Sequence, residues 1–84
     1  TTSFVAFFSL NPTLKAAFVT SKKTGNAVNR NKARRRMRAL FASYEQQLVI
    51  GNYIFVAKVT LHDKNFLELK KDFDFALKRL EVLK

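Results

Sequence analysis

Residues 26–44 constrain the fold of this chain more than any other stretch, because they predict one long helix with a narrow apolar side. The amide oxygen of Asn26 can accept a hydrogen bond from the first helical turn, and Gly25 suits a sharp turn before it. Beyond this cap, apolar residues recur at spacings of three and four, which places them on one side of a helix. These residues are Ala33, Met37, Leu40, Phe41 and Tyr44. We expect this side to pack into the protein core.

The other sides of the same helix are strongly basic. One row consists of Arg30, Arg34 and Arg38, and a second consists of Lys32 and Arg36, with Arg35 between them. Cations near a helix N-terminus and like charges four residues apart each cost roughly 0.2–1 kcal/mol, and no acidic residue lies nearby to offset them. A helix destabilised this consistently is expected to serve a polyanionic partner. A solvated basic face and a localisation signal are the alternatives.

The charge of the whole chain is concentrated in its first half. The 84 residues carry a net charge of +10, with nine basic and no acidic residues in 1–44 and seven basic and six acidic residues in 45–84. This distribution favours nucleic acid as the partner. An anionic membrane surface is the alternative, but the apolar side of the helix is needed for the core. The length indicates one domain, and the lack of cysteine excludes disulfides and thiolate zinc sites.

Three strands are predicted around this helix. Residues 1–10 form a strand that is apolar on both faces, and a turn at Asn11-Pro12 separates it from a second strand at residues 14–20. We expect these two strands to pair antiparallel through that short connection. Residues 45–51 connect the basic helix to a third strand at residues 53–60, which is rich in β-branched and aromatic residues. A turn at Gly51-Asn52 precedes it, and residues 61–64 form a loop after it.

A second helix follows, and it obeys the usual rules of helix stability. Asn65 and Glu68 have the spacing of a capping box, acidic residues come early and basic residues come late. Asp72 and Asp74 are therefore interpreted as complements of the helix dipole. The predicted apolar side consists of Phe66, Leu69, Phe73, Ala76, Leu77, Leu80 and Leu83.

The predicted fold class is α/β (α+β), with a small mixed sheet of three to four strands and helices packed on it. The helix between the second and third strands is a βαβ crossover, so those strands can run parallel. Both helices can cover one face of the sheet, which leaves the other face open unless something outside residues 1–84 covers it. No nucleophile–base set or phosphate-binding loop is evident, and the single histidine, His62, is interpreted as a surface residue.

The basic turn and helix carry a specific resemblance. Residues 21–28 read Ser-Lys-Lys-Thr-Gly-Asn-Ala-Val, and Arg30-Asn31-Lys32 opens the helix after them. This pattern resembles the bacterial ribonuclease P protein component, in which an Arg-Asn-Arg motif opens a basic helix. Lys32 departs from that motif, because it keeps the charge but loses the planar guanidinium. Family members also begin with an aromatic-bearing helix, so we expect residues 1–84 to be a single RNA-binding domain that lacks this helix.

The resemblance implies the RNA-binding protein subunit of an endoribonuclease. In this family a catalytic RNA removes the 5′ leader of precursor tRNA with magnesium, and the protein binds the leader and the RNA without supplying catalytic side chains. It implies no cofactor bound by the protein alone, a left-handed crossover, a bacterial cytoplasmic location, no membrane association, and a monomer outside the complex. A stand-alone small RNA-binding or ribosomal protein is the alternative, and an enzyme acting alone is a third hypothesis.

Two sets of site residues follow from the resemblance. The expected RNA-binding residues are Lys22, Lys23, Asn26, Arg30, Asn31, Lys32, Arg34, Arg35 and Arg38. Asn31 is expected to orient RNA backbone or metal-bound water, whereas Arg36 is as readily idle as bound. The expected leader-binding cleft consists of Phe7, Lys15, Ala17, Tyr53 and Lys58. Ordinary core positions are the alternative for Phe7 and Tyr53.

Overall fold

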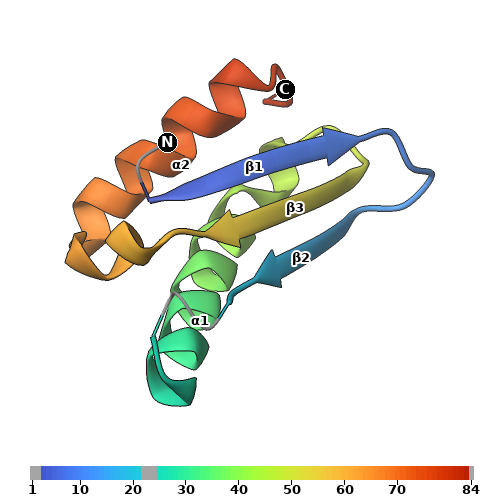
Figure 1. Ribbon diagram of the computed structural model, residues 1–84. Helices are drawn as coiled ribbons and strands as arrows, with labels where there is room; N and C mark the ends of the chain where they lie inside the picture. Colours follow the sequence, from blue (N-terminus) through green and yellow to red (C-terminus); the bar gives the residue numbers. More distant parts are fainter. Residues whose placement is uncertain (1–2, 22–24, 84) are drawn as a thin grey trace.

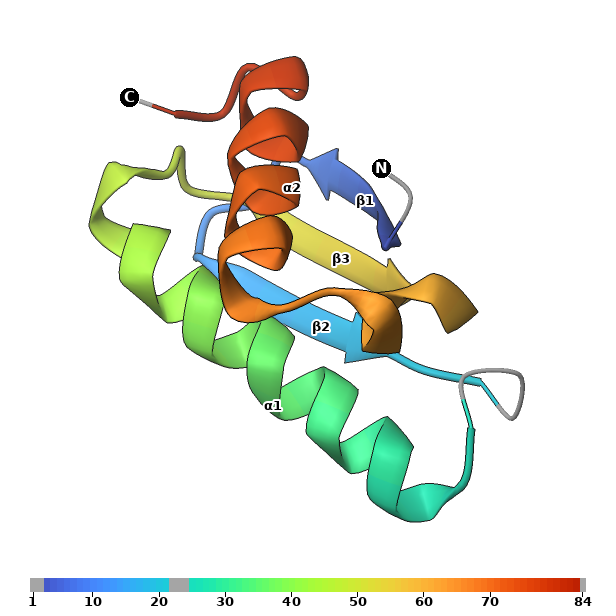
Figure 2. The same ribbon diagram turned by 90° about the vertical axis from the view of Figure 1, so that its left-hand side faces the viewer.

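The computed structural model describes residues 3–21 and 25–83 and has two layers, a three-stranded sheet and two helices on one of its faces (Figure 1). In chain order the elements are β1 (Phe4–Ser9), β2 (Lys15–Val19), α1 (Ala27–Tyr44), η2 (Glu45–Gln47), β3 (Asn52–Ala57), η3 (Val59–Asp63) and α2 (Phe66–Arg79), where η denotes a short 3₁₀ helix. Figure 2 shows both helices on the same side of the sheet. The predicted α/β class and the placement of both helices on one face of the sheet are confirmed.

The strand order is β1-β3-β2, with β3 antiparallel to β1 and parallel to β2. The chain passes from β2 through α1 to β3 in a left-handed crossover, the uncommon hand for such a connection (Figure 1). The parallel pairing of β2 and β3 is thus confirmed. The expected β1–β2 hairpin is wrong, because β3 lies between these strands. Residues 10–14 are long enough to cross the roughly 10 Å that two strand spacings require.

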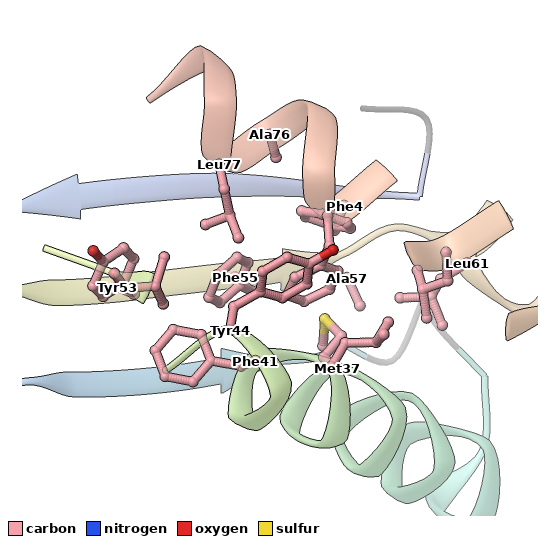
Figure 3. Packing of buried hydrophobic residues seen from close by; sticks show 14 of the residues in the cluster. Phe4, Met37, Phe41, Tyr44, Tyr53, Phe55, Ala57, Leu61, Ala76 and Leu77 are labelled. Carbon is pink, nitrogen blue, oxygen red and sulfur yellow. The ribbon is translucent and has the colours of Figure 1, made fainter. Parts of the chain in front are cut away.

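The core is an aromatic cluster between the sheet and the helices (Figure 3). Phe55 of β3 lies at its centre and is fully buried. Its ring stacks on Phe73 of α2 at a centroid distance of 5.0 Å and on Phe18 of β2 at 5.7 Å, and it meets Phe41 of α1 edge-on at 5.7 Å. One residue of the central strand therefore joins β2 and both helices.

Helix α1 forms as its sequence predicts. The Asn26 side chain caps it by accepting a hydrogen bond from the Asn29 amide at 2.9 Å. The five residues of the predicted apolar side are the five buried residues of this helix. Gly25, just before the cap, has a φ of +123°, a backbone region that favours glycine.

Helix α2 is shorter than its apolar pattern indicates. The capping box between Asn65 and Glu68 is confirmed, but the helix ends at Arg79. Phe66 was expected in the core and is 55% exposed, because contact between α2 and the core begins only at Leu69. Leu83 lies beyond the helix, where it forms an isolated β-bridge with Leu48.

Strand β3 ends three residues before the predicted boundary at Thr60. Residues Val59–Asp63 form η3 instead of continuing the strand and then a loop. The β-branched residues there favour a strand locally, but Leu61 is fully buried, and the turn of η3 brings it into the core (Figure 3). Tertiary packing therefore overrides local preference at this point.

Two acidic residues of α2 join it to neighbouring elements. The Ser3 hydroxyl donates to the Asp72 carboxylate, and the Tyr44 hydroxyl donates to the Asp74 carboxylate. Burial and the adjacent Asp74 raise the pKa of Tyr44 above its ordinary value of 10.0. These acids were interpreted only as dipole complements, and the structure adds a specific contact for each of them.

Candidate nucleic-acid interface

Helix α1 presents its basic residues on the side that faces away from the core. The side chains of Asn31, Lys32, Arg35 and Arg38 are exposed, and those of Arg30, Arg34 and Arg36 are half-buried. No acidic residue occurs in the helix, so its positive potential is not offset within the element. Among residues 3–21 and 25–83, the hydrogen bonds of its arginines are with neutral groups. Their charges therefore remain available to an external anion.

Arg34 makes two of these neutral contacts. Its Nη1 donates to Thr20 Oγ1 at 2.9 Å, and its Nη2 donates to Asn31 Oδ1. Thr20 directly follows β2, whereas Asn31 lies one helical turn before Arg34. The guanidinium therefore links the start of α1 to the end of β2.

Arg36 serves the protein's own structure. Its guanidinium donates to the backbone carbonyl oxygens of Leu61, at 3.4 Å, and of Lys64. The Leu61 carbonyl belongs to η3, and the Lys64 carbonyl belongs to the connection from η3 to α2. The sequence left open whether Arg36 binds RNA, and these contacts show that its side chain is engaged within the protein.

Arg38 lies over an aromatic ring of β2. Its guanidinium carbon is 5.8 Å from the centroid of the Phe18 ring, within the range of a cation–π contact. The side chain is nevertheless exposed, so the contact restricts its position without removing it from solvent. Of the remaining predicted RNA-binding residues, Asn26 is exposed at the N-cap, and Lys22 and Lys23 lie outside the described residues.

The sheet face opposite the helices is the second feature of the interface. Strand register arranges its side chains in three rows across the strands, two apolar and one polar. The rows are Val5–Val56–Val19, Phe7–Ile54–Ala17 and Ser9–Asn52–Lys15. Phe7 is 53% exposed and provides the largest ring on this face. This face therefore combines an exposed aromatic ring with a polar row two residues away.

The structure separates the predicted cleft residues. Phe7, Lys15 and Ala17 share the open face, and Lys58 is exposed one residue past β3. Tyr53 was wrongly assigned to the cleft, since it is fully buried on the opposite face and its hydroxyl donates to the Val49 carbonyl oxygen at 2.5 Å. Strand alternation places its neighbours Ile54 and Asn52 on the open face instead.

Sequence reasoning missed six residues of this face, namely Val5, Ser9, Val19, Asn52, Ile54 and Val56. The signal that could have found them is the period of two within each strand. This alternation shows which residues share a face, but it identifies the open face only when the strand register is known, because each strand here is apolar on both faces or nearly so.

Among residues 3–21 and 25–83, no three His, Cys, Asp or Glu side chains gather in an arrangement that could hold a metal ion. Over the same residues, neither helix is long and apolar enough to cross a membrane.

Fold and surface together define a small α/β protein with a basic helix on one face of its sheet and exposed apolar and polar rows on the other. The sequence model of the Ribonuclease P family matches residues 1–81, and the chain belongs to this family. A curated relative, the ribonuclease P protein component of Nitratiruptor, is 41% identical over 78 residues, which are 93% of this chain and 72% of the relative. The Staphylococcus epidermidis protein component is 36% identical over 74% of this chain and 54% of its own length.

Solved structures agree with this membership. The RNase P protein of Staphylococcus aureus superposes with a TM-score of 0.88 at 26% identity, covering all of this chain and 80% of its own. The RNase P protein of Thermotoga maritima shares the fold with a TM-score of 0.79 at 23% identity, covering 92% of this chain and 76% of its own. The family and fold predicted from the basic turn and helix are therefore confirmed.

Proposed function

We propose that this chain is the RNA-binding subunit of a bacterial, cytoplasmic ribonuclease P that removes the 5′ leader of precursor tRNA. The observation that carries the proposal is the arginine-rich side of α1, which has no acidic residue in its own helix and no carboxylate among its recorded arginine contacts. Cleavage is assigned to a catalytic RNA with magnesium. The protein's own contribution is to bind and position RNA.

Helix α1 is proposed to bind phosphates of the catalytic RNA. A folded RNA brings phosphates close together, and a helix that carries several cations can replace the counterions that those phosphates would otherwise hold. Arg30, Lys32 and Arg35 are the leading candidates, since among the described residues no hydrogen bond or ion pair engages their side chains. Arg38 can contribute from its position over Phe18.

The open sheet face is proposed to bind the single-stranded leader. Base–aromatic stacking is tolerant of sequence, and Phe7 offers an exposed ring for it. Lys15 and Asn52 lie in the polar row beside it, where they can contact the leader backbone. Ala17 lies in the same row as Phe7, on the far side of Ile54, and its small side chain keeps that end of the row shallow.

The test is leader removal from precursor tRNA by a catalytic ribonuclease P RNA at low magnesium. Added protein is expected to stimulate cleavage, and a double variant Arg30→Ala, Arg35→Ala is expected to lose most of the stimulation. Lys70→Ala, Lys71→Ala is the matched control, because it removes two exposed cations from α2. RNA binding without stimulation would support a stand-alone RNA-binding protein instead, and cleavage without added RNA would support an enzyme acting alone.

A further inference from the structure

The guanidinium of Arg34 holds Asn31 in one orientation. A guanidinium has only hydrogen-bond donors, so the amide atom that faces it must be the carbonyl oxygen. The contact from Arg34 Nη2 to Asn31 Oδ1 has this form. The amide NH₂ group of Asn31 therefore points away from Arg34, and the residue is exposed. Asn31 thus offers a hydrogen-bond donor to the surface.

Arg34 is itself held in place from outside its helix. The Thr20 hydroxyl accepts from Nη1 at 2.9 Å, and Thr20 lies 14 residues earlier in the chain. An arginine side chain loses much rotamer freedom when it is fixed, and a second anchor reduces what remains to be lost on binding. Arg34 is therefore hydrogen-bonded to both Thr20 and Asn31 and links the two residues.

We propose that Thr20 and Arg34 are positioning residues, which orient the Asn31 amide so that its NH₂ group binds a phosphate oxygen of RNA. The proposal rests on the function proposed above. A phosphate oxygen only accepts hydrogen bonds, so it matches a donor. A metal-bound water donates hydrogen bonds and would have to share the Asn31 oxygen with Arg34, whereas the NH₂ group is directed away from Arg34. The geometry thus favours RNA backbone over metal-bound water as the Asn31 partner.

Thr20 should therefore affect RNA binding although its side chain carries no charge. Thr20→Val keeps the shape of the side chain but removes the hydroxyl, whereas Thr20→Ser keeps the hydroxyl. We expect Thr20→Val to weaken binding of the catalytic RNA about threefold to tenfold, the usual effect of one hydrogen bond. The slope of log affinity against log salt should not change, because no phosphate contact by a cation is lost. Thr20→Ser should bind as the wild type does.

A double-mutant cycle tests whether Thr20 acts through Asn31. Asn31→Ala should weaken RNA binding, and adding Thr20→Val to it should cause no further loss. Independent losses that multiply in the double variant would overturn the proposal, as would full affinity in Thr20→Val or equal losses in the Val and Ser variants. Thermal unfolding of each variant shows whether it is folded.

Arg34→Lys provides a second route to the same answer if Thr20→Val does not fold. Lysine keeps the charge but lacks the planar fork that reaches both acceptors. Arg34→Lys should also weaken RNA binding, and it should cause no further loss when Asn31→Ala is already present. Independent losses would count against the proposal. A wild-type protein that fails to bind the catalytic RNA would instead refute the proposed function. Additive losses in a binding-competent wild type refute only the positioning role.

Discussion

Adjacent arginines of α1 have different surroundings, because successive helical residues face different directions. Arg35 is exposed, whereas Arg36 turns inward to the carbonyl groups of Leu61 in η3 and of Lys64 just after it. Their side chains are chemically identical. The two residues differ only in the groups that each guanidinium can reach. Substituting one should therefore have a different effect from substituting the other.

Arg35→Ala and Arg30→Ala should each reduce RNA binding through lost electrostatics. Each lost phosphate contact lowers the slope of log affinity against log salt by about 1. Folding stability should be almost unchanged for the exposed Arg35. Filter binding of the catalytic RNA across a salt series provides the measurement, and an unaltered slope in both variants would contradict the assignment.

Arg36→Ala should show the opposite pattern. It leaves two backbone carbonyl groups without their charged donor, which costs about 1–3 kcal/mol of folding free energy. Urea unfolding measures this loss. For the protein that remains folded, the salt dependence of RNA binding should match the wild type, and a reduced slope would show that Arg36 contacts phosphate after all.

Tyr44 makes the stability of the protein depend on alkaline pH. Its pKa is raised in the folded state, so the folded protein holds this proton more tightly than the unfolded chain does. Its contribution is therefore complete below pH 10 and declines as pH rises above the unfolded value. Unfolding free energies measured from pH 8 to 11 should fall less steeply in Tyr44→Phe. Burial also raises the pKa of Tyr53, so part of the decline should persist in that variant.

At the scale of elements, the lack of a side chain at Gly51 lets the backbone just before β3 lie close to β1. A Cβ atom there would lie 2.4 Å from Phe8 Cε1 and 2.8 Å from the Ser9 carbonyl oxygen. Gly51→Ala should therefore destabilise the protein by about 1–3 kcal/mol, as overpacking does, measured by chemical denaturation.

Gly25→Ala is the informative comparison. Its Cβ would meet only the Asn29 side chain, at 3.0 Å, so its cost comes mainly from the positive φ, about 1–2 kcal/mol. A neutral effect of Gly51→Ala would show that β1 and the β3 entry can separate.

The two helices could be predicted from the sequence more fully than the sheet. Helical periodicity identifies the buried side of α1 residue by residue, because one side must face the core. The strands carry no equivalent signal. Phe7 and Tyr53 both belong to strands with apolar residues on both faces, yet one is exposed and the other is buried. Only the pairing of β3 with both other strands decides between them, and this pairing depends on contacts distant in sequence.

At the scale of the whole molecule, the two proposed RNA surfaces lie on different layers. The basic side of α1 belongs to the helical layer, and the row containing Phe7 belongs to the opposite face of the sheet (Figure 2). A substitution on one layer should therefore leave binding at the other largely intact.

Phe7→Ala should selectively weaken binding of precursor tRNA that carries a leader, with mature tRNA as the control ligand. Loss of one stacked base costs about 1–3 kcal/mol of binding. The loss of folding free energy should be smaller than for Phe55→Ala, which leaves a cavity in the core and costs about 3–5 kcal/mol. Equal losses for leader-bearing and mature tRNA would argue against a leader site on the sheet.

The central place of β3 also sets the order in which the protein can assemble. Neither β1 nor β2 has a neighbour until the strand ending at Ala57 is made, so during synthesis the sheet cannot close before the ribosome has released that strand. Helix α1, which carries the basic residues, leaves the ribosome before β3 does. A nascent chain thus exposes its basic residues while both outer strands still lack a partner.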